Sequence, residues 1–309
     1  MLNAERIKGL MLRAGFDRVG IVAPHRLAEA EEHFRKWLER GDHASLGYLE
    51  RNIDKRFDPA RLVEGCQSLV VGAVGYKNRH WLGSTPKGTP QIASYALCTD
   101  YHITIKRMLH EVFEALRQDS PTLQGRAFTD SAPLAEKQLA IEAGIGWQGR
   151  QSLIISPSLG SFFLLGELLL TEPCDHYDTP FQEEHCGSCR ACIEACPVGA
   201  IGEDRTIDAR LCLARRTIEL GEEAQGDLHG RLFGCDACQS CCPHNRHTPL
   251  ASHPDFQPIF DPSEFDCKRW QQLTHKEFSR LFGQTPLTRA GLDRLKENAK
   301  LIELKFNEQ

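Results

Sequence analysis

The stretch CGSCRACIEACPVG, residues 186 to 199, places cysteines at spacings that suit iron-sulfur chemistry. The C-x2-C-x2-C-x3-C-P run of bacterial ferredoxins is matched by Cys186, Cys189, Cys192 and Cys196, followed by Pro197. In such a run, three closely spaced thiolates bind corners of one cubane cluster, while the fourth reaches a second cluster. The segment therefore predicts a site that carries electrons.

A second group of thiols further along the chain supplies the remaining ligands. By the ferredoxin crossover, we expect one 4Fe-4S cluster on Cys186, Cys189, Cys192 and Cys242, and the other on Cys196, Cys212, Cys235 and Cys238. Cys241 precedes an expected ligand and could compete for the same iron, but we prefer Cys242 because a proline follows it. Two zinc sites with four thiolates each are the alternative, which the two Cys-Pro endings disfavour.

Composition and cysteine usage indicate the class of protein and its compartment. The 309 residues are 41% hydrophobic and 26% charged, as in soluble globular proteins, and the length suggests two domains. No apolar run approaches the roughly 18 residues that cross a bilayer, so we expect a cytoplasmic protein with no membrane partner. The 13 cysteines then favour metal ligation over disulfides. The net charge of -5 disfavours a uniformly basic nucleic-acid binder, although a local basic patch could still face RNA.

Mixed helix and strand patterns precede the cysteines. Helical spacing of apolar residues predicts helices over residues 7–16, 27–41, 100–118 and 133–144. Strands are predicted over residues 16–22, 67–76, 152–156 and 161–171, and the last two alternate little, as in strands covered on both faces. A change in sequence composition near residue 173 predicts a domain boundary. Further along the chain, helices are predicted over residues 275–283 and 288–305. The part before the boundary is large enough to house the electron acceptor.

Three polar residues before the boundary are candidates for function. Asp130 could simply cap the following helix, as could Ser131. Alternatively, a carboxyl group partly buried beside a large apolar cofactor has a raised pKa and can act as a proton donor near neutrality. Arg56 could meet an anionic cofactor edge or pair with a nearby surface aspartate, Asp54 or Asp58. His102 begins a predicted helix, as a first-turn residue or as a functional one. The residues alone leave these choices open.

The glycines of AGIGWQGR, residues 143 to 150, have the spacing of a dinucleotide-binding fingerprint. That fingerprint must follow a strand and open a helix, whereas these glycines close a predicted helix and lead into a strand. We therefore do not predict a nicotinamide site. The glycines instead allow the backbone to approach a flat ligand closely.

Taken together, these segments resemble epoxyqueuosine reductases, cobalamin-dependent iron-sulfur enzymes of tRNA modification. The resemblance spans almost the whole chain, and it is carried by IDKRFDP, ASYALCTDYH, TDSAPLAEKQLAIEAGIGWQGRQSLIISPSLGSFFLLGELLL, CGSCRACIEACPVGAI, DARLCLARRTIE and FGCDACQSCCPHN. It implies an α+β fold with an α/β cobalamin-binding catalytic domain at residues 1–173. A ferredoxin-like domain with two 4Fe-4S clusters would follow at 174–250, and a short helical C-terminal extension at 251–309.

The same resemblance implies reduction of epoxyqueuosine to queuosine in tRNA that carries this base in the anticodon loop. Electrons from an external low-potential donor would pass through the two clusters to cobalamin, and Asp130 would be the proton donor. Cobalamin contacts would come from Arg56, His102, Asp130, Ile154 and Leu165, the last two mainly through their backbone. We expect the protein to act as a monomer.

Two features depart from the family pattern. Cys98 stands where members often carry glycine, and the CLARRT segment changes the expected tRNA contacts near Arg215 and Arg216.

Two other functions remain possible at this stage. One alternative is a corrinoid reductive dehalogenase that acts on a small organohalide. The other is a non-catalytic ferredoxin-type electron-transfer protein, which would take up no cobalamin.

Overall fold

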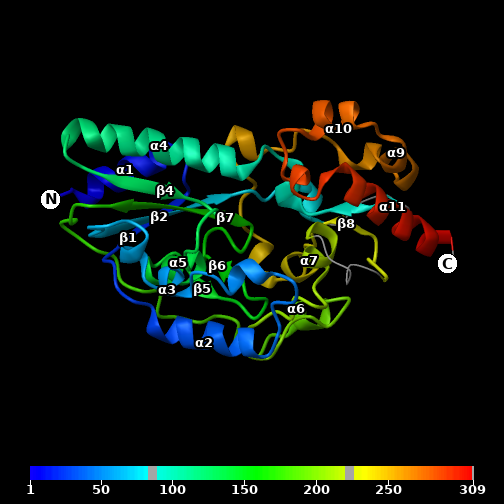
Figure 1. Ribbon diagram of the computed structural model, residues 1–309, viewed down its shortest axis with the longest axis horizontal. Helices are drawn as coiled ribbons and strands as arrows, with labels where there is room; N and C mark the ends of the chain where they lie inside the picture. Colours follow the sequence, from blue (N-terminus) through cyan, green and yellow to red (C-terminus); the bar gives the residue numbers. More distant parts are fainter. Residues whose placement is uncertain (83–88, 220–225, 308–309) are drawn as a thin grey trace.

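A computed structural model of the chain describes residues 1–82, 89–219 and 226–307 (Figure 1). The helices of the first half are α1 (Ala4–Arg13), α2 (Ala28–Glu39), α3 (Ile53–Arg56), α4 (Tyr101–Asp119) and α5 (Glu136–Glu142). Those of the second half are α6 (Ala191–Glu194), α7 (Leu213–Ile218), α8 (Ala237–Ser240), α9 (Cys267–Gln272), α10 (His275–Phe282) and α11 (Gly291–Asn307). The strands are β1 (Arg18–Val22), β2 (Ser68–Gly75), β3 (Gln91–Ile92), β4 (Gly125–Phe128), β5 (Trp147–Gln148), β6 (Ile154–Ile155), β7 (Phe163–Leu170) and β8 (Arg231–Phe233).

The main sheet has four strands in the order β1-β2-β7-β4, and every neighbouring pair is antiparallel. Its two central strands, β2 and β7, are the two long apolar runs of the sequence. Every residue of β2 is buried, because helices cover both faces of the sheet. In Figure 1, α1 and α4 lie on one face and α2, α3 and α5 on the other. The mixed fold that the sequence predicts is confirmed.

The two faces of the sheet form separate apolar cores. Met11 and Ile105 belong to the core under α1 and α4, whereas Leu139 and Leu169 belong to the core under α5. Since side chains alternate along a strand, β7 sends neighbouring residues into different cores. The residue at position 167 therefore points toward α5.

The region around β5 and β6 differs from its prediction. The strand expected over residues 152–156 is shortened to β6, which pairs with β5 in a separate small sheet. Ser152 has a φ of 66°, a left-handed conformation that breaks an extended strand. Gly144, with a φ of 70°, turns the chain out of α5 as the helix-closing glycine was expected to do.

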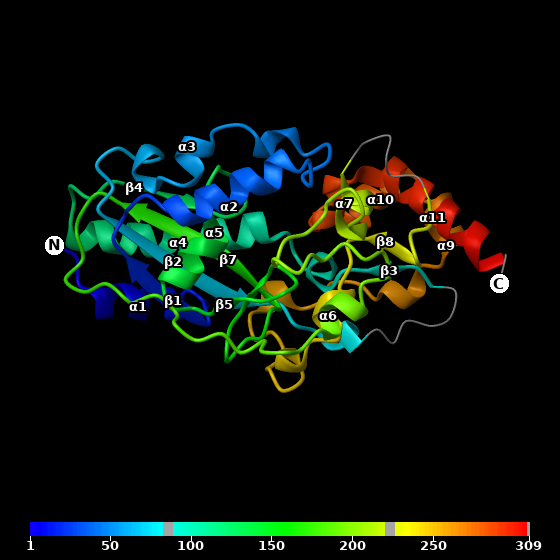
Figure 2. The ribbon, with the colours of Figure 1, turned by 90° about the horizontal axis from the view of Figure 1, so that it is seen from below.

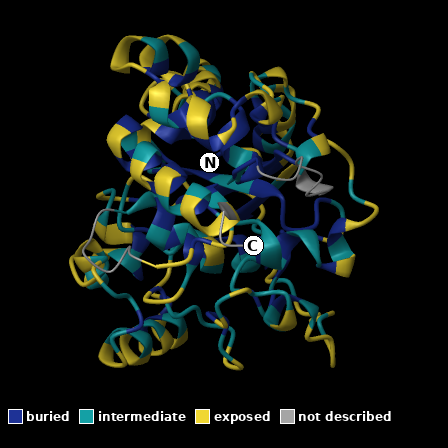
Figure 3. Ribbon diagram, turned by 90° about the vertical axis from the view of Figure 1, so that its right-hand side faces the viewer, coloured by how far each residue is buried: buried dark blue, intermediate teal, exposed yellow. Residues whose placement is uncertain are grey.

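The cysteine-rich part and the last helices lie at the other end of the molecule from α1 (Figures 1 and 2). The short helices α6 and α8 pack against each other, and β8 pairs in parallel with β3 from the first half. Trp270 and Phe282 stack at the centre of a third core beneath α9, α10 and α11. Figure 3 shows the exposed residues gathered on the outer helices and loops, with buried segments between them.

The chain just after residue 173 packs against the first half. Pro173 O accepts a hydrogen bond from the Leu2 N–H at 2.8 Å, and the Asp178 N–H donates to Ile21 O at 2.7 Å. Cys174 lies in the core under α1 and α4. The boundary at residue 173 stays a prediction.

Across the described ranges, no helix has both the length and the apolar character needed to cross a membrane.

Candidate active site and cysteine groups

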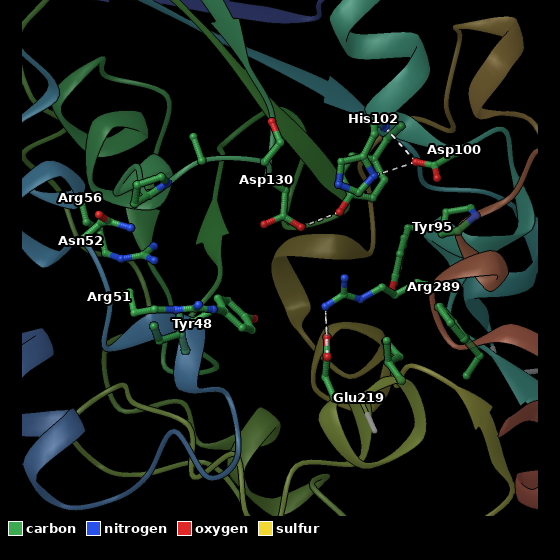
Figure 4. Close-up of a pocket in the computed structure, with 18 residues that line it drawn as sticks. Tyr48, Arg51, Asn52, Arg56, Tyr95, Asp100, His102, Asp130, Glu219 and Arg289 are labelled. Carbon is green, nitrogen blue, oxygen red and sulfur yellow. Dashed lines mark hydrogen bonds and ion pairs between the residues drawn. The ribbon is translucent and has the colours of Figure 1, made fainter. Parts of the chain in front are cut away.

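A pocket of about 720 Å³ lies where the main sheet meets the C-terminal helices (Figure 4). Its volume is in the usual range for ligand and cofactor sites. The lining residues are Tyr48, Leu49, Arg51, Asn52, Arg56, Tyr95, Asp100, Tyr101, His102, Asp130, Ser131, Ala132, Pro133, Ile218, Glu219, Phe233, Pro286 and Arg289. Polar side chains from segments far apart in the sequence therefore meet in one pocket.

Asp130 lies in the loop after β4, with an exposed side chain in the pocket. The Tyr101 hydroxyl donates to Asp130 Oδ2 at 2.6 Å, and the Asp130 main-chain N–H donates to Glu136 Oε1 at 2.6 Å. Asp130 has a φ of 46°, in the left-handed region that non-glycine residues rarely adopt. Helix α5 begins at Glu136 instead of next to Asp130 or Ser131, and its N-cap is Ala135. The capping alternative is therefore wrong, and the Asp130 carboxyl group is available to the pocket.

The start of α4 orders the aromatic side of the pocket. Asp100 caps the helix, because its Oδ1 accepts the His102 main-chain N–H at 2.9 Å and contacts His102 Nδ1 at 2.8 Å. The His102 ring stacks on Tyr101 with the ring centroids 4.1 Å apart. Asp100 thus fixes His102, which packs on the tyrosine that holds Asp130.

Arg56, the last residue of α3, lines the pocket; in Figure 4 it lies on the other side of Asp130 from His102. Its expected surface partners, Asp54 and Asp58, both bond Arg61 instead, each at 3.1 Å. Burial lowers the pKa of Arg56, and its Nε makes no hydrogen bond within the described residues. The surface-pair alternative is therefore wrong, and a partly desolvated cation is available to a ligand.

Two predicted contacts, Ile154 and Leu165, are not among the residues that line this pocket. Ile154 is buried in β6, and Leu165 packs against the same core under α5. The Leu165 carbonyl accepts the Thr129 hydroxyl at 2.8 Å. Because Thr129 directly precedes Asp130, this bond ties the start of the Asp130 loop to β7.

Two carboxyl groups lie behind the Asp130 loop. Glu167 is fully buried in β7, opposite Val71 of β2 and Phe128 of β4. The Glu136 carboxyl group faces it, and neither Glu167 oxygen has a hydrogen-bond partner within the described residues. Burial, with the Asp130 charge adding to it, raises the pKa of Glu136 to about 7. Burial and then Glu136 raise the pKa of Glu167 well above its ordinary value, so the pair retains a proton near neutral pH.

This pair makes the stability of the fold depend on pH. The pKa of Glu136 in the folded protein, about 7, lies above its ordinary value of 4.5. The protonated Glu136 side chain therefore adds its full share to the unfolding free energy below about pH 4.5, and this share is lost as the pH rises through 7. Between about pH 5 and pH 8, we expect the wild type to lose about 2 kcal/mol more unfolding free energy than Glu136→Gln. Urea unfolding of the two cluster-loaded proteins at both pH values measures this difference. Equal losses would contradict the raised pKa.

The first predicted set of thiols lies together. Burial raises the pKa of Cys242 to about 11, and the neighbouring Cys186, Cys192 and Cys189 add to this effect. Cys241 shares Cys192 and Cys189 with it as neighbours: burial, then Cys192 and Cys242, raise the pKa of Cys241 to about 11. The structure thus brings the predicted ligands of one cluster together and places Cys241 beside them.

The second predicted set also lies together. Burial and then the charges of Cys235 and Cys212 raise the pKa of Cys238 well above its ordinary value, and Cys196 neighbours both Cys212 and Cys235. Cys241 also faces Cys238.

In the described part of the chain, no three His, Cys, Asp or Glu side chains form a group that could hold a single metal ion.

Several residues of the site were not identified from the sequence. Tyr101 and Glu136 stand within the quoted family segments, but their contacts with Asp130 depend on the left-handed turn. Glu167 is visible in the sequence only as one charge within the apolar run SFFLLGELLLT. Across the pocket, Arg289 bonds both carboxylate oxygens of Glu219 at 3.0 and 3.1 Å, and this pair from the second half lines the pocket beside residues of the first half.

Comparison with known families supports two parts of the chain separately. Residues 185–245 match a family described as a 4Fe-4S double cluster binding domain. Residues 56–131, which include Arg56 and Asp130, match the family described as epoxyqueuosine reductase QueG, DUF1730. The cysteine groups therefore belong to a recognised iron-sulfur domain, and Arg56 and Asp130 precede it in the chain.

Whole-chain comparisons cover both parts at once. The epoxyqueuosine reductase of Cyclobacterium marinum is 35% identical over 305 residues, which is 97% of each chain. The crystal structure of a selenomethionine-labelled epoxyqueuosine reductase matches with a TM-score of 0.89 and 26% identity, covering 98% of this chain and 82% of that one. An epoxyqueuosine reductase solved with an epoxyqueuosine-modified tRNA-Tyr stem loop has a TM-score of 0.85 and 26% identity, over 98% and 81%. With this fold and these cysteine groups, the chain belongs to the epoxyqueuosine reductase family of oxidoreductases.

Proposed function

We propose that this chain reduces epoxyqueuosine to queuosine in cytoplasmic tRNA, with two 4Fe-4S clusters, cobalamin and Asp130 as proton donor. The observation that carries the proposal is the Asp130 carboxyl group, held in the pocket by Tyr101 and by the Glu136 contact to its backbone. The solved relative with a modified tRNA stem loop supports tRNA as the substrate. An external low-potential donor supplies the electrons, and the chain acts as a monomer.

The thiols fit two iron-sulfur clusters because they form two groups with thiolate ligands alone. One cluster is assigned to Cys186, Cys189, Cys192 and Cys242, and the other to Cys196, Cys212, Cys235 and Cys238. When bound, the clusters deliver electrons singly and cobalamin supplies a reducing cobalt centre for the epoxide. The protein positions these groups and provides the proton.

The pocket offers features that fit a corrin with anionic or polar edges. Arg56 presents a guanidinium whose Nε has no hydrogen-bond partner in the described chain, and such a group can bond a ligand. We assign cobalamin contacts to Arg56, His102 and Asp130, with Ile154 and Leu165 contributing mainly backbone from behind the pocket wall. The stacked His102 and Tyr101 rings give one side of the pocket a flat aromatic edge.

Asp130 is placed to protonate the oxygen that leaves. Removal of the epoxide oxygen as water takes up two electrons and two protons and leaves an alkene. When the first carbon–oxygen bond breaks, an alkoxide forms; Asp130 gives it the first proton to make a hydroxyl group, and a second proton from solvent lets this group leave as water. Because the Tyr101 hydroxyl bonds Oδ2, Asp130 Oδ1 remains to carry the proton toward the substrate.

Replacement of Arg56 tests the assigned cofactor contact. We expect Arg56→Met to weaken cobalamin binding about tenfold, because one charge-assisted hydrogen bond is lost. Arg61→Met is the matched control, since Arg61 forms its ion pairs with Asp54 and Asp58 at the surface. Absorption titration of the cluster-loaded protein with cobalamin measures both affinities. Equal affinities in the two variants would remove Arg56 from the cofactor site.

Genetic complementation tests the function as a whole. We expect this chain to restore queuosine in the tRNA of a bacterium that lacks its own epoxyqueuosine reductase, as measured by nucleoside mass analysis. Continued accumulation of epoxyqueuosine despite soluble, cluster-loaded protein would contradict the proposal. Release of halide from an organohalide by that protein would then favour the dehalogenase alternative.

A further inference from the structure

The main chain of Asp130 needs a restraint that its own residue type does not provide. Its φ of 46° is unfavourable for any residue with a Cβ atom. The Tyr101 hydroxyl bonds the side chain but does not fix the backbone. The backbone contact comes from Glu136, whose Oε1 accepts the Asp130 N–H at 2.6 Å from the first turn of α5. One side chain thus holds the turn that points Asp130 into the pocket.

Glu136 faces a second carboxyl group from the sheet. Glu167 of β7 lies behind it, and two buried carboxyl groups that face each other repel when both are ionised, so one of them keeps a proton. Glu167 is fully buried, and within the described chain neither of its oxygens receives an N–H or hydroxyl. Burial opposes ionisation of both groups, so a shared proton is the arrangement that satisfies the pair.

The charges around the pair are few. Asp130, His102 and Arg56 face Glu136 from the loop after β4, from α4 and from α3. Of the other strands packed against α5, β1 carries Arg18, whose Nε bonds the Ser158 hydroxyl at 2.8 Å. The strands β2, β5 and β6 consist of uncharged residues.

We propose that Glu136 is a positioning residue for Asp130, and that Glu167 holds Glu136 in place by sharing one proton with it. The inference rests on the proposed function of Asp130 as the acid. Glu136 is not among the residues that line the pocket, so its contact with the pocket runs through the Asp130 backbone. A misplacement of about 1 Å at a reacting group lowers the rate about a hundredfold, which makes this restraint important for turnover.

Steady-state kinetics test the positioning role. We expect Glu136→Ala to lower kcat about a hundredfold, with the KM for tRNA and the cobalamin affinity within about twofold of wild type. Glu136→Gln should stay within about fivefold of the wild-type kcat, because its amide oxygen accepts the same N–H. Glu142→Gln, at the other end of α5, is the control and should be unchanged. Full kcat in Glu136→Ala, or a parallel loss of cobalamin binding, would overturn the role.

Two further measurements do not depend on turnover. In crystal structures, the Asp130 turn should leave the left-handed region in Glu136→Ala and keep it in Glu136→Gln; Glu136→Asp replaces the alanine variant if that variant fails to fold. In infrared spectra of the holoenzyme at neutral pH, a protonated-carboxyl band should be lost in Glu167→Gln and kept in Glu142→Gln. An unmoved turn, or a band that persists in Glu167→Gln, would overturn the inference even if the wild type proved inactive on epoxyqueuosine. An inactive wild type with both signatures intact would contradict only the proposed function.

Discussion

We expect Asp130→Asn to abolish queuosine formation while leaving cobalamin bound. The amide has the size of the carboxyl group, and its oxygen can still accept the Tyr101 hydroxyl, so the pocket keeps its shape. What is lost is the proton that the opening epoxide needs. Loss of a positioned general acid lowers rates by roughly 10²- to 10⁴-fold, and we expect the upper part of this range because the alkoxide is a poor leaving group.

Single-turnover assays on cluster-loaded, cobalamin-loaded protein measure this loss directly. Asp119→Asn is the matched control, because Asp119 forms an exposed ion pair with Arg6 at the far end of α4 and should leave the rate unchanged. An Asp130→Asn protein that turns over at the wild-type rate would show that another group delivers the proton. Loss of cobalamin binding in that variant would instead assign Asp130 a structural role.

The adjacent residues Cys241 and Cys242 give the second large effect. Cys242→Ala should bind about four iron atoms per chain where the wild type binds about eight, and it should lose epoxyqueuosine reduction, because one cluster lacks a ligand and the electron route is interrupted. Cys241→Ala should keep both the iron content and the activity. The two variants decide between the adjacent thiols as the fourth ligand, because both thiols face the same neighbours, Cys192 and Cys189.

Iron analysis, electron paramagnetic resonance of the reduced proteins and activity distinguish the two variants. Cys267→Ala is a further control, since Cys267 is buried in the core beneath the C-terminal helices. If Cys241→Ala loses a cluster and Cys242→Ala does not, the assignment of the fourth ligand is wrong, and the following proline does not mark it. Loss in both variants would mean that the two cysteines share the task.

Local sequence patterns predicted the elements that carry unbroken periodicity. The apolar runs at 67–76 and 161–171 became β2 and β7, and the helical pattern at 100–118 became α4. By contrast, β4 is a short segment, Gly125–Phe128, with no apolar run of its own. It is a strand because β7 offers it a partner edge, and long-range pairing of this kind leaves little local signal.

The candidate site was only partly readable for the same reason. The Asp130 motif and the cysteine spacings are local, so the sequence identified those residues. The Glu136 contact requires the backbone of Asp130 to lie in the left-handed region, and the residue type alone does not predict that conformation. Glu219 and Arg289 reach the pocket only because the second half of the chain packs beside the first.

An anaerobic reaction of the purified chain with tRNA that carries epoxyqueuosine tests most directly whether this chain reduces the base with cobalamin. The protein is loaded with iron and sulfide and given a low-potential reductant, with and without cobalamin, and the nucleosides are then analysed by mass. We expect queuosine only when cobalamin is present. Queuosine at the same rate without cobalamin, or none in its presence from protein with full iron content, would contradict it.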